Sequence, residues 1–390
     1  MRLLIHAPYF RPHVGGVEAY VEELTEALWV SGRVEALTVI APALPGGAAL
    51  EHDARGTRIL RYPGVEPIAN FPVPRPSRAL ARCLATAIDP APDLVVGNTR
   101  FFLASAVALG QARWLRVPYL HIEHGSDYVQ LDQRWAAAVA RAYDHTLGRT
   151  VLLRADRVVA ISEAASGFVE RLTGRSPEVV YRGLPLQRLA SVASAPDAPG
   201  LAAGRPVLVY AGRLIDGKGV RDLVEAVGGL AEDVLCVVLG DGPRREDLER
   251  QAEARAPGRF AFLGYVSEDH VIAWMKAADI VVNPSYTEGL PTTVLLAAAC
   301  GTAVVATDVG GTREICPNGE AGLLVPPRNP ELLRRALQRL LADPAERERL
   351  GDGGRTRAAR LFDWPRCAEA LLSVSGGAAR RPRPAPASPS

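Results

Sequence analysis

The chain has 390 residues, of which 48% are hydrophobic and 23% charged, and its formal net charge is +2 at pH 7. At roughly 150 residues per domain, this length predicts two or three domains, and we expect two. The composition is ordinary for a globular protein, and the nearly balanced charge argues against nucleic acid as a partner.

Cysteine usage and the lengths of apolar runs bear on compartment and membrane attachment. The five cysteines are odd in number and scattered, with no CxxC pair, which predicts a reduced, cytosolic compartment. Met1–Ala7 is too short an apolar stretch for a signal peptide, and no run approaches the roughly 20 apolar residues of a membrane span. We therefore expect a cytoplasmic protein whose membrane contact, if it has one, is peripheral at the inner face.

The first half alternates short apolar runs with segments of helical periodicity. A strand at Arg2–Ala7 leads to Gly15 and Gly16, and a helix follows that ends at Gly32. Further strands are expected at Ala36–Ala41, Thr57–Tyr62, Asp93–Gly97, Val117–Glu123, Arg157–Ile161 and Glu178–Tyr181, and helices at Ser77–Ile88, Phe101–Leu109, Gln133–Leu153 and Ala165–Thr173. This α/β alternation predicts a doubly wound, Rossmann-like domain in residues 1–188, with a parallel sheet covered on both faces.

The alternation stops and then restarts. Residues 189–205 are rich in Ala, Ser, Pro and Gly without periodicity, which is typical of a linker. Residues 206–362 would form a second doubly wound domain, followed by a helix in 363–375 and a disordered tail in 376–390. Its strands are expected at Val207–Ala211, Leu235–Leu239, Phe260–Leu263, Ala278–Val282, Thr302–Ala306 and Gly322–Val325, and its helices at Val220–Val227, Arg244–Ala256, His270–Ala277, Thr293–Cys300, Glu331–Leu341, Glu346–Leu361 and Trp364–Val374.

The strand-to-helix loops of the second domain carry candidate ligand-binding residues, because open parallel sheets bind ligands beyond the carboxyl ends of their strands. The first loop begins at Gly212 and supplies Arg213 and Lys218. Two cations there would complement a diphosphate, one as a planar fork and the other as a point charge. Taken alone, these are equally compatible with surface charges.

The next two loops add backbone groups. Gly240 and Gly242 would let the backbone approach a flat ligand, and the backbone around Tyr265 and Val266 would face a nucleotide base. Each glycine alone is compatible with a plain turn. The joint occurrence of such loops at successive strand ends favours a nucleotide site.

The fourth loop, Ser285–Pro291, predicts a phosphate seat. Pro291 would occupy the first helical position, which leaves the N–H groups of Gly289 and Leu290 available to an anion. Glu288 would repel phosphate, so we expect its carboxylate to accept hydrogen bonds from sugar hydroxyls. The alternative is a solvated loop acid beside a core helix.

The first domain contributes two further features. Gly15 and Gly16 before a helix resemble an anion-binding turn, although a plain tight turn would look the same. His124 follows the strand Val117–Glu123 and would point into a cleft, where it could donate to a sugar or phosphate oxygen; a lone histidine is also commonly structural. The histidines have no metal-ligand spacing and Asp-x-Asp is absent, so we expect neither a metal nor a cofactor.

With these motifs together, the chain resembles family 4 of the glycosyltransferases, which are retaining enzymes of the GT-B fold, over nearly its whole length. The resemblance rests on Pro12–Glu18 (PHVGGVE), Glu123–Gly125 (EHG), Val158–Glu163 (VVAISE), Gly212–Gly219 (GRLIDGKG), Gly240–Pro243 (GDGP) and Ser285–Ile315, which contains SYTEGLP and ACGTAVVATDVGGTREI. It implies two Rossmann-like domains facing across a cleft, a donor nucleotide held by the second domain, an acceptor held by the first, and a C-terminal helix that crosses back.

The resemblance also implies roles for individual residues. Gly16 would let the first helix meet the donor phosphate, Arg213 and Lys218 would neutralise the diphosphate leaving group, and His124 and Glu288 would contact the transferred sugar. The departing phosphate oxygen would help to deprotonate the acceptor on the same face, which explains a site without an obvious nucleophile.

Two positions depart from the family pattern. Leu296 stands where the family has a second Glu that holds the ribose hydroxyls, and this loss should cost on the order of 1.5–3 kcal/mol of donor binding. Arg182 stands where the family commonly has Asn.

Three functional hypotheses follow. The favoured one is a metal-independent glycosyltransferase that moves a sugar from a nucleotide-diphosphate sugar to a lipid-linked or polysaccharide acceptor in cell-envelope or exopolysaccharide synthesis. A non-catalytic relative that binds a nucleotide or partner is the alternative, and it rests on Leu296. An epimerase or dehydrogenase on the same architecture is disfavoured because GxGxxG is missing. Separately, arginines on the segments Arg75–Ile88 and Gln133–Arg154 would suit peripheral contact with anionic lipid or a solvated surface equally well.

Overall fold

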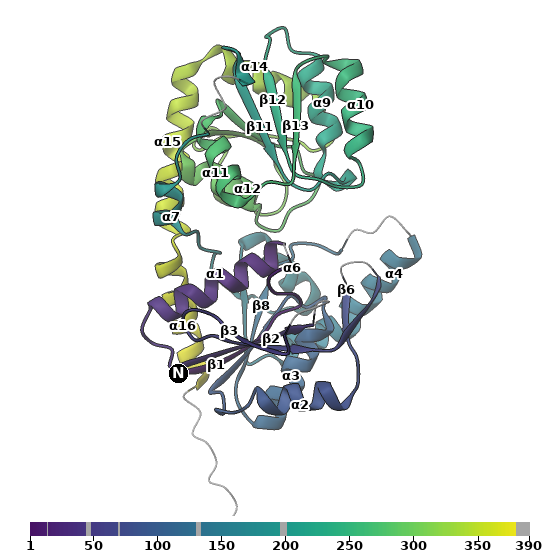
Figure 1. The fold of residues 1–390 in the computed structure, drawn as a ribbon, viewed down its shortest axis with the longest axis vertical. Helices are drawn as coiled ribbons and strands as arrows, with labels where there is room; N and C mark the ends of the chain where they lie inside the picture. Colours follow the sequence, from purple (N-terminus) through teal and green to yellow (C-terminus); the bar gives the residue numbers. More distant parts are fainter. Residues whose placement is uncertain (14, 44–47, 69–70, 130–133, 196–200, 380–390) are drawn as a thin grey trace, which may run out of the picture. The chain divides into compact units, whose positions relative to one another are not determined.

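The computed structural model describes residues 1–13, 15–43, 48–68, 71–129, 134–195 and 201–379. The chain divides into two compact units (Figure 1). Unit 1 comprises Met1–Ile161, Ala165–Tyr181 and the C-terminal segment from Trp364, and unit 2 comprises Ser162–Ala164 and Arg182–Asp363.

Unit 1 is built on a sheet in which β1 (Arg2–His6) is central and the strand order is β10-β9-β8-β7-β1-β2-β4-β3. The other strands are β2 (Ala36–Pro42), β3 (Leu50–His52), β4 (Arg58–Tyr62), β7 (Leu94–Asn98), β8 (Tyr119–Glu123), β9 (Arg157–Ala160) and β10 (Glu178–Val179). Apart from the edge strands β3 and β10, these strands are buried at their centres, because helices cover both faces of the sheet and favour continuous apolar runs.

The helices of unit 1 are α1 (Gly16–Val30), α2 (Arg78–Thr86), α3 (Leu103–Leu115), α4 (Arg134–Tyr143), α5 (Arg149–Arg154), α6 (Glu163–Thr173) and α16 (Trp364–Ala379). In Figure 1, α1 covers one face of the sheet and α2 and α3 the other. The helix expected over Gln133–Leu153 is confirmed from Arg134 onward, and Gln133 lies outside the described residues. The sequence did not predict the π-helical turn at Asp144–Gly148 between α4 and α5. Helical periodicity cannot signal this turn, because one extra residue per turn leaves the composition unchanged.

The expectation of a purely parallel sheet is also incomplete for unit 1. β3 pairs with β4 antiparallel, and β5 (Gly64–Ile68) and β6 (Phe71–Pro74) form a separate antiparallel pair. These strands leave little signal in the sequence. β3 is a short edge strand with an exposed Leu50, and β5 and β6 contain prolines, which lack the N–H that a ladder uses.

Unit 2 has a parallel sheet with the strand order β13-β12-β11-β14-β15-β16 in its described part. The strands are β11 (Val207–Ala211), β12 (Leu235–Leu239), β13 (Phe260–Gly264), β14 (Ile280–Asn283), β15 (Ala303–Thr307) and β16 (Leu323–Val325). The helices are α7 (Leu186–Ser191), α9 (Val220–Gly228), α10 (Arg245–Arg255), α11 (Glu268–Ala277), α12 (Thr292–Cys300), α13 (Thr312–Ile315), α14 (Pro330–Ala342) and α15 (Pro344–Leu361).

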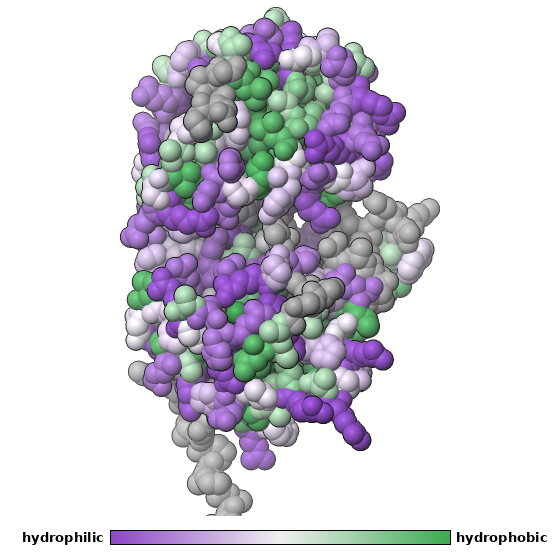
Figure 2. Space-filling model, viewed as in Figure 1, coloured by the Kyte–Doolittle hydropathy of each residue, from purple (hydrophilic) through white to green (hydrophobic). Residues whose placement is uncertain are grey.

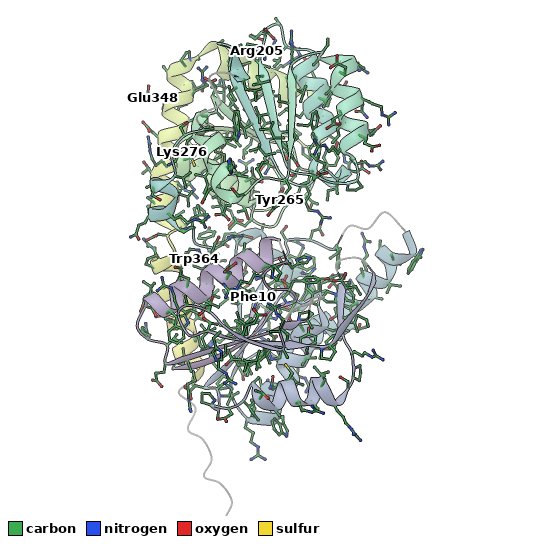
Figure 3. The ribbon with its side chains drawn as sticks, viewed as in Figure 1. Phe10, Arg205, Tyr265, Lys276, Glu348 and Trp364 are labelled. Carbon is green, nitrogen blue, oxygen red and sulfur yellow. The ribbon has the colours of Figure 1, made fainter. Side chains whose placement is uncertain are left out.

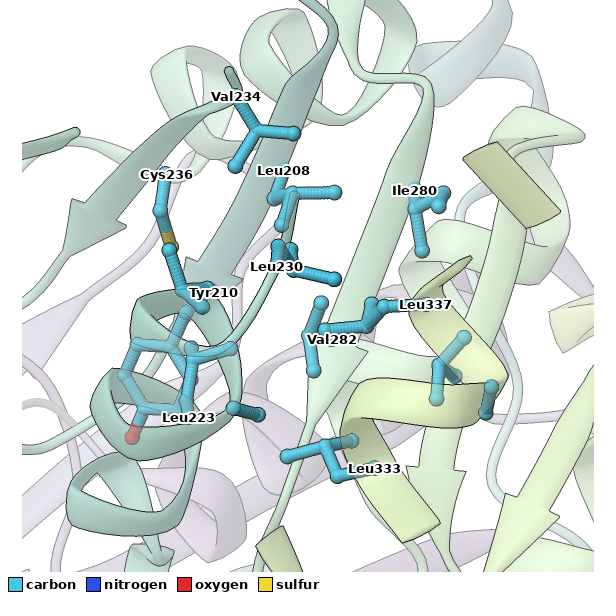
Figure 4. Packing of buried hydrophobic residues seen from close by; sticks show 14 of the residues in the cluster. Leu208, Tyr210, Leu223, Leu230, Val234, Cys236, Ile280, Val282, Leu333 and Leu337 are labelled. Carbon is cyan, nitrogen blue, oxygen red and sulfur yellow. The ribbon is translucent and has the colours of Figure 1, made fainter. Parts of the chain in front are cut away.

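The core of unit 2 joins the sheet to α9 and α14. Figure 4 shows Leu208, Cys236 and Val282 from the strands, with Leu223 of α9 and Leu337 of α14 packed among them. These five side chains are fully buried. Each of the Leu and Val side chains therefore contributes roughly 1.5–3 kcal/mol of hydrophobic stabilisation. On the other side of the sheet, α12 contacts α11 and α15.

The segment expected as a linker, residues 189–205, is partly regular where it is described, and its residues 196–200 lie outside the described residues. Its start lies in α7, and the Lys276 side chain on α11 donates hydrogen bonds to the carbonyls of Leu189, Ala190 and Val192 (Figure 3). Leu189 is also buried. In the sequence, the division between the units falls between Tyr181 and Arg182, so α7 belongs to unit 2, to which these hydrogen bonds attach it.

The C-terminal helix α16 belongs to unit 1. Trp364 lies at its start (Figure 3), and the indole Nε1–H donates to Glu23 of α1 at 2.9 Å. The tail expected to be disordered from residue 376 begins with a continuation of this helix to Ala379. The rest of that tail lies outside the described residues.

No described helix combines the length and the apolar character that crossing a bilayer requires. The space-filling view in Figure 2 shows hydrophobic areas interrupted by hydrophilic residues on the face in view.

His6, the last residue of β1, predicts a specific acid sensitivity. It is 1% exposed and its Nε2 lies 2.8 Å from the Gln111 Oε1 atom. Burial lowers the pKa of His6 from 6.5 to about 4, against the opposing effect of the hydrogen bond to Gln111. Between these two pH values, His6 is therefore protonated in the unfolded chain and neutral in the folded chain.

The contribution of His6 to the free energy of unfolding is then fully present above pH 6.5. It falls by about 3 kcal/mol as the pH is lowered toward 4. We expect urea unfolding to show this loss in the wild type and a smaller one in His6→Gln, which keeps an N–H donor but does not titrate. An identical pH dependence in both proteins would contradict the assignment.

Candidate functional site

An ion pair joins two of the loops at the carboxyl edge of the unit 2 sheet. Lys218 lies in the loop after β11 and Glu288 in the loop after β14, and the Lys218 Nζ atom is 2.6 Å from the Glu288 Oε1 atom. Their side chains are 29% and 12% exposed. The structure therefore brings together a cation and a carboxylate that are 70 residues apart in sequence.

Glycine makes this approach of the two loops possible. The Tyr286 N–H donates to the Gly217 carbonyl at 2.9 Å. Gly219 has φ of 65°, and a Cβ atom there would lie 2.0 Å from the Pro284 carbonyl oxygen. Any larger residue would push the loops apart, so Gly219 is needed to place Lys218 beside Glu288.

Gly212, Gly240 and Gly242 serve a similar contact between the loops after β11 and β12. A Cβ atom on Gly240 would lie 2.0 Å from the Gly212 carbonyl oxygen, and one on Gly242 would lie 2.5 Å from the Leu214 carbonyl oxygen. These glycines therefore bring the backbone close to the neighbouring loop. That they also let it approach a flat ligand stays a prediction.

Arg213 differs from Lys218 in its surroundings. Its side chain is exposed, and within the described residues it forms no hydrogen bond or ion pair. Its carbonyl accepts a hydrogen bond from the buried Tyr210 hydroxyl at 3.0 Å, which holds the backbone in place. An anion that arrives at this loop thus meets one uncommitted guanidinium and one ammonium that already has a partner.

The loop where a phosphate seat is expected leads into α12, and its helix begins one residue later than expected. Pro291 is the residue before the helix, with ψ of 111°, and Thr292 is the first helical residue. The Gly289 carbonyl accepts from the Gly311 N–H at 2.7 Å. Among the described residues, the N–H groups of Gly289 and Leu290 have no protein acceptor, so this loop can still donate to an anion.

Arg182, which the sequence flagged only as a departure, lies at the same helix end. Its guanidinium donates to the Thr292 Oγ1 atom at 3.1 Å, and the residue is 3% exposed. A buried cation therefore stands beside the first turn of α12. The motif alone gives no signal for this contact, because it joins positions that are 110 residues apart.

The remaining donor-site candidates of unit 2 differ in how far their side chains are exposed to water. Tyr265 is 68% exposed and Val266 half-buried, in the loop after β13 (Figure 3). Leu296 is 6% exposed within α12. Leu296 thus occupies a position where a carboxylate would be largely shielded from water and would need a bonding partner.

In unit 1, Gly15 and Gly16 lie at the start of α1, as expected. The Glu18 carboxylate folds back over this turn, so that a Cβ atom on Gly15 would lie 2.4 Å from the Glu18 Oε2 atom. Glu18 is 7% exposed and its Oε1 atom is 2.7 Å from the His13 Nδ1 atom. No heavy atom comes within 4 Å of a Cβ placed on Gly16, so this side of the turn is open. A ligand anion would approach past Gly16 and would meet the Glu18 charge beside it.

His124 lies immediately after β8, where a hydrogen-bond chain defines its tautomer. The Asn98 Nδ2 atom donates to the His6 carbonyl at 3.1 Å, so Asn98 presents Oδ1 to the His124 Nε2 atom at 3.2 Å. Neutral His124 must then carry its hydrogen on Nε2. The Tyr20 ring meets the imidazole edge to face, with 4.6 Å between ring centroids.

A buried ionic network supports the backbone at His124. The Glu123 carboxylate accepts hydrogen bonds from the N–H groups of Arg100, His124 and Gly125, and Oε1 also pairs with the Arg100 guanidinium at 2.9 Å. Burial alone would raise the pKa of Glu123, but the charge of Arg100 and the bonds from His121 and Gly125 hold it well below its usual range.

Arg100 is in turn held by Asp144. The Arg100 Nε atom lies 3.1 Å from Asp144 Oδ1, both side chains are at most 1% exposed, and Asp144 begins the π-helical turn. Burial raises the pKa of Asp144, and Arg100 opposes that rise. The sequence analysis does not predict this network of Glu123, Arg100 and Asp144. Its one local signal is an acidic residue at the end of a buried strand.

The described residues contain no group of three or more His, Cys, Asp or Glu side chains placed to hold a metal ion. His124 and the turn at Gly16 belong to unit 1, and the Lys218 and Glu288 pair belongs to unit 2. Each set is built by loops at the carboxyl ends of its own parallel sheet, which is the usual ligand-binding edge.

Comparisons with known proteins identify the family. Residues 14–188 match the family model Glycosyltransferase Family 4, and residues 193–357 match Glycosyl transferases group 1. An uncharacterized glycosyltransferase of Methanocaldococcus jannaschii is 29% identical over 374 residues, covering 93% of this chain and 95% of the relative. The D-inositol 3-phosphate glycosyltransferase of Xylanimonas cellulosilytica is 33% identical over 312 residues, covering 74% and 73%.

Solved structures agree with the fold. Sucrose-phosphate synthase from Thermosynechococcus elongatus has a TM-score of 0.80 at 24% identity, covering 97% of this chain and 99% of that one. Anabaena HepE in complex with UDP-glucose has a TM-score of 0.74 at 20% identity, covering 97% and 100%. The chain is therefore a glycosyltransferase of family 4, with the two Rossmann-like domains of the GT-B fold.

Proposed function

We propose that this glycosyltransferase is a retaining, metal-independent enzyme that takes its sugar from a nucleotide-diphosphate sugar. The observation that carries the proposal is the Lys218 and Glu288 pair beside the N–H groups of Gly289 and Leu290. An ammonium, free backbone donors and a carboxylate at one sheet edge match a diphosphate joined to a polyhydroxyl sugar. HepE, a structural neighbour, is seen with UDP-glucose.

The proposed reaction exchanges one bond at the sugar's anomeric carbon. The bond to the diphosphate oxygen breaks, the acceptor oxygen bonds on the same face, and the acceptor's proton passes to the departing phosphate. Arg213 and Lys218 would stabilise the negative charge that grows on this leaving group, so no metal is needed for that purpose. Glu288 would accept hydrogen bonds from the sugar hydroxyls, and His124 would contact the transferred sugar.

The ion pair holds the Lys218 side chain in place, and it also reduces the net positive charge at this position. In the ligand-free protein the Glu288 carboxylate compensates the ammonium, which is only 29% exposed. When a diphosphate binds, Lys218 would gain a second anionic partner, and Glu288 would be released in part toward the sugar. Loss of Lys218 leaves the half-buried Glu288 charge facing the phosphates, which is worse than loss of both charges.

We expect Lys218→Met to lower kcat/KM by about 10²- to 10³-fold, as removal of one charge-stabilising donor commonly does. Lys218→Met with Glu288→Gln should then lose less than the product of the two single losses, because the pair is coupled. Donor hydrolysis or transfer by purified protein measures both. Glu253→Gln, an exposed acid of α10, serves as the control. Full activity of Lys218→Met would contradict the assigned role.

The non-catalytic alternative is favoured by one observation, the burial of Leu296 within α12. At 6% exposure, this side chain packs as a core residue and cannot accept a hydrogen bond from a ribose hydroxyl. An active enzyme would bind its nucleotide mainly through phosphate and base contacts.

A panel of UDP-, GDP- and ADP-sugars, with EDTA present, separates the two readings. We expect one nucleotide class to raise the Tm of the wild type and to be consumed, since ligand at 100 times its Kd adds about 2.7 kcal/mol of stability. Leu296→Glu should be less stable without ligand, because its carboxylate is buried, and should gain more from the nucleotide. Leu296→Met is the matched apolar control. Response of Leu296→Glu alone would instead establish the non-catalytic reading.

We also propose a lipid-linked or glycan acceptor in cell-envelope or exopolysaccharide synthesis, with peripheral contact between unit 1 and the inner face of the membrane. Exposed apolar side chains on α4 support that contact: Trp135 is 63% and Val139 59% exposed, with the exposed Arg141 on the same helix. Tryptophan with nearby arginine suits the interface of an anionic bilayer.

Vesicle co-sedimentation tests the membrane contact. The wild type should pellet with phosphatidylglycerol-containing vesicles and much less with phosphatidylcholine alone, because the contact includes an electrostatic attraction. Trp135→Ser with Val139→Ser should pellet several-fold less. Trp114→Ser removes an equally exposed tryptophan from α3 and should behave as the wild type. No dependence on anionic lipid would end this proposal.

A further inference from the structure

A pocket of unit 2 lies beside the loop that carries Lys218 and is not lined by the residues predicted to hold the donor. Its volume is about 370 Å³, and α9, α10, the loop after β11, Tyr286 and Arg328 line it. Arg213, Lys218, Glu288 and Gly289 are not among the lining residues. The volume is within the roughly 300–1,000 Å³ typical of small-molecule sites.

The charged lining is arginine-rich. Arg221, Arg244 and Arg328 contribute +3 and Asp216 and Asp247 contribute −2, which leaves +1. Arg244 pairs with Asp216 at 2.5 Å and Arg221 pairs with Asp247 at 3.0 Å. The two carboxylates are therefore committed to two of the guanidiniums, and the net positive charge comes from the third.

Arg328 is that third cation. Its guanidinium lies over the Tyr286 ring, 4.0 Å from the ring centroid, and in the described part of the chain its N–H groups have no hydrogen-bond acceptor. Stacking on an aromatic face fixes the plane of a guanidinium while leaving its edge available for a bidentate oxyanion. The Tyr286 ring is itself fixed, since its hydroxyl donates to Asp222 at 3.0 Å.

The backbone of Arg328 is also unusual. Its φ is 59°, in the left-handed region that non-glycine residues rarely adopt. Such a conformation costs of order 1 kcal/mol or more and tends to persist at ligand clamps. The loop after β16 therefore holds Arg328 over Tyr286 in a strained backbone conformation.

Apolar side chains complete the opposite wall, from Ile215, Val220 and Leu248. A ligand with an oxyanion at one end and a carbon skeleton at the other matches both walls. A phosphate monoester carries about −1.5 to −2 charge at pH 7 and three acceptor oxygens. A carboxylate has less negative charge and fewer acceptor oxygens for the three arginines.

We propose that this pocket is a binding site for a small organic phosphate, held by Arg328 with the remaining N–H groups of Arg221. The site is separate from the donor site but shares a loop with it, because Tyr286 is two residues from Glu288 and its N–H bonds to Gly217 beside Lys218. A bound phosphate would stiffen the loop pair that carries the donor-site ion pair.

Arginine footprinting tests the proposal at the residue concerned. The full chain is treated with phenylglyoxal with and without glucose 6-phosphate, and modification is mapped by mass spectrometry. Arg328 should be protected by the ester and not by glucose, and Arg335, an exposed arginine of α14, should be modified equally in all samples. Absence of protection at Arg328 would overturn the proposal.

Calorimetry of variants excludes binding through the donor loops. Arg328→Asn removes the cation while tolerating a left-handed backbone, and we expect its affinity for glucose 6-phosphate to fall at least tenfold. Arg335→Asn and Lys218→Met should bind as the wild type does. Unchanged affinity in Arg328→Asn, or loss of binding in Lys218→Met alone, would show that the ester occupies the donor loops and would refute a second site. Equal binding of gluconate would refute the preference for phosphate.

Discussion

Close backbone contact between loops is the constraint on which the unit 2 site depends. Gly219 packs against the Pro284 carbonyl, Gly240 against Gly212, and Gly310 against Glu288, each at a spacing where a Cβ atom would lie 2.0 Å or less from a carbonyl oxygen. These contacts close the carboxyl edge of the sheet into one surface. Lys218 and Glu288 can then pair across loops that belong to different strands, and the N–H groups before α12 stay directed outward.

The two units stabilise their functional loops differently. In unit 1, Glu123, Arg100 and Asp144 are fully buried, so the network rigidly positions the backbone at His124, and removal of one charge would leave another uncompensated. In unit 2, Lys218 and Glu288 keep contact with water. A partly solvated pair can exchange partners when a ligand arrives, whereas a buried one cannot. Positioning and ligand response thus fall to different kinds of ion pair.

Substitutions relative to the family pattern gather at α12. Leu296 makes this helix more apolar, and Arg182 adds a buried cation at its first turn, bonded to Thr292. Both changes shift the local charge in the positive direction. The phosphate groups of a donor would therefore carry a greater share of its binding here than the ribose. The arginine-lined pocket beside Tyr286 extends the same preference for phosphate to the other side of the loop pair.

Local patterns in the sequence predict most of the parallel strands, the helices that cover them and the loops that carry Arg213, Lys218, Glu288 and His124, because burial on both faces and strand-end glycines leave local signals. Which of these residues come into contact depends on the folded chain. The Lys218 and Glu288 pair, the Arg100 network and the Arg182 contact join residues 23 to 110 positions apart. The sequence patterns also did not predict the π-helical turn and the proline-containing strands, because these elements are stabilised by neighbouring parts of the fold and leave no local pattern.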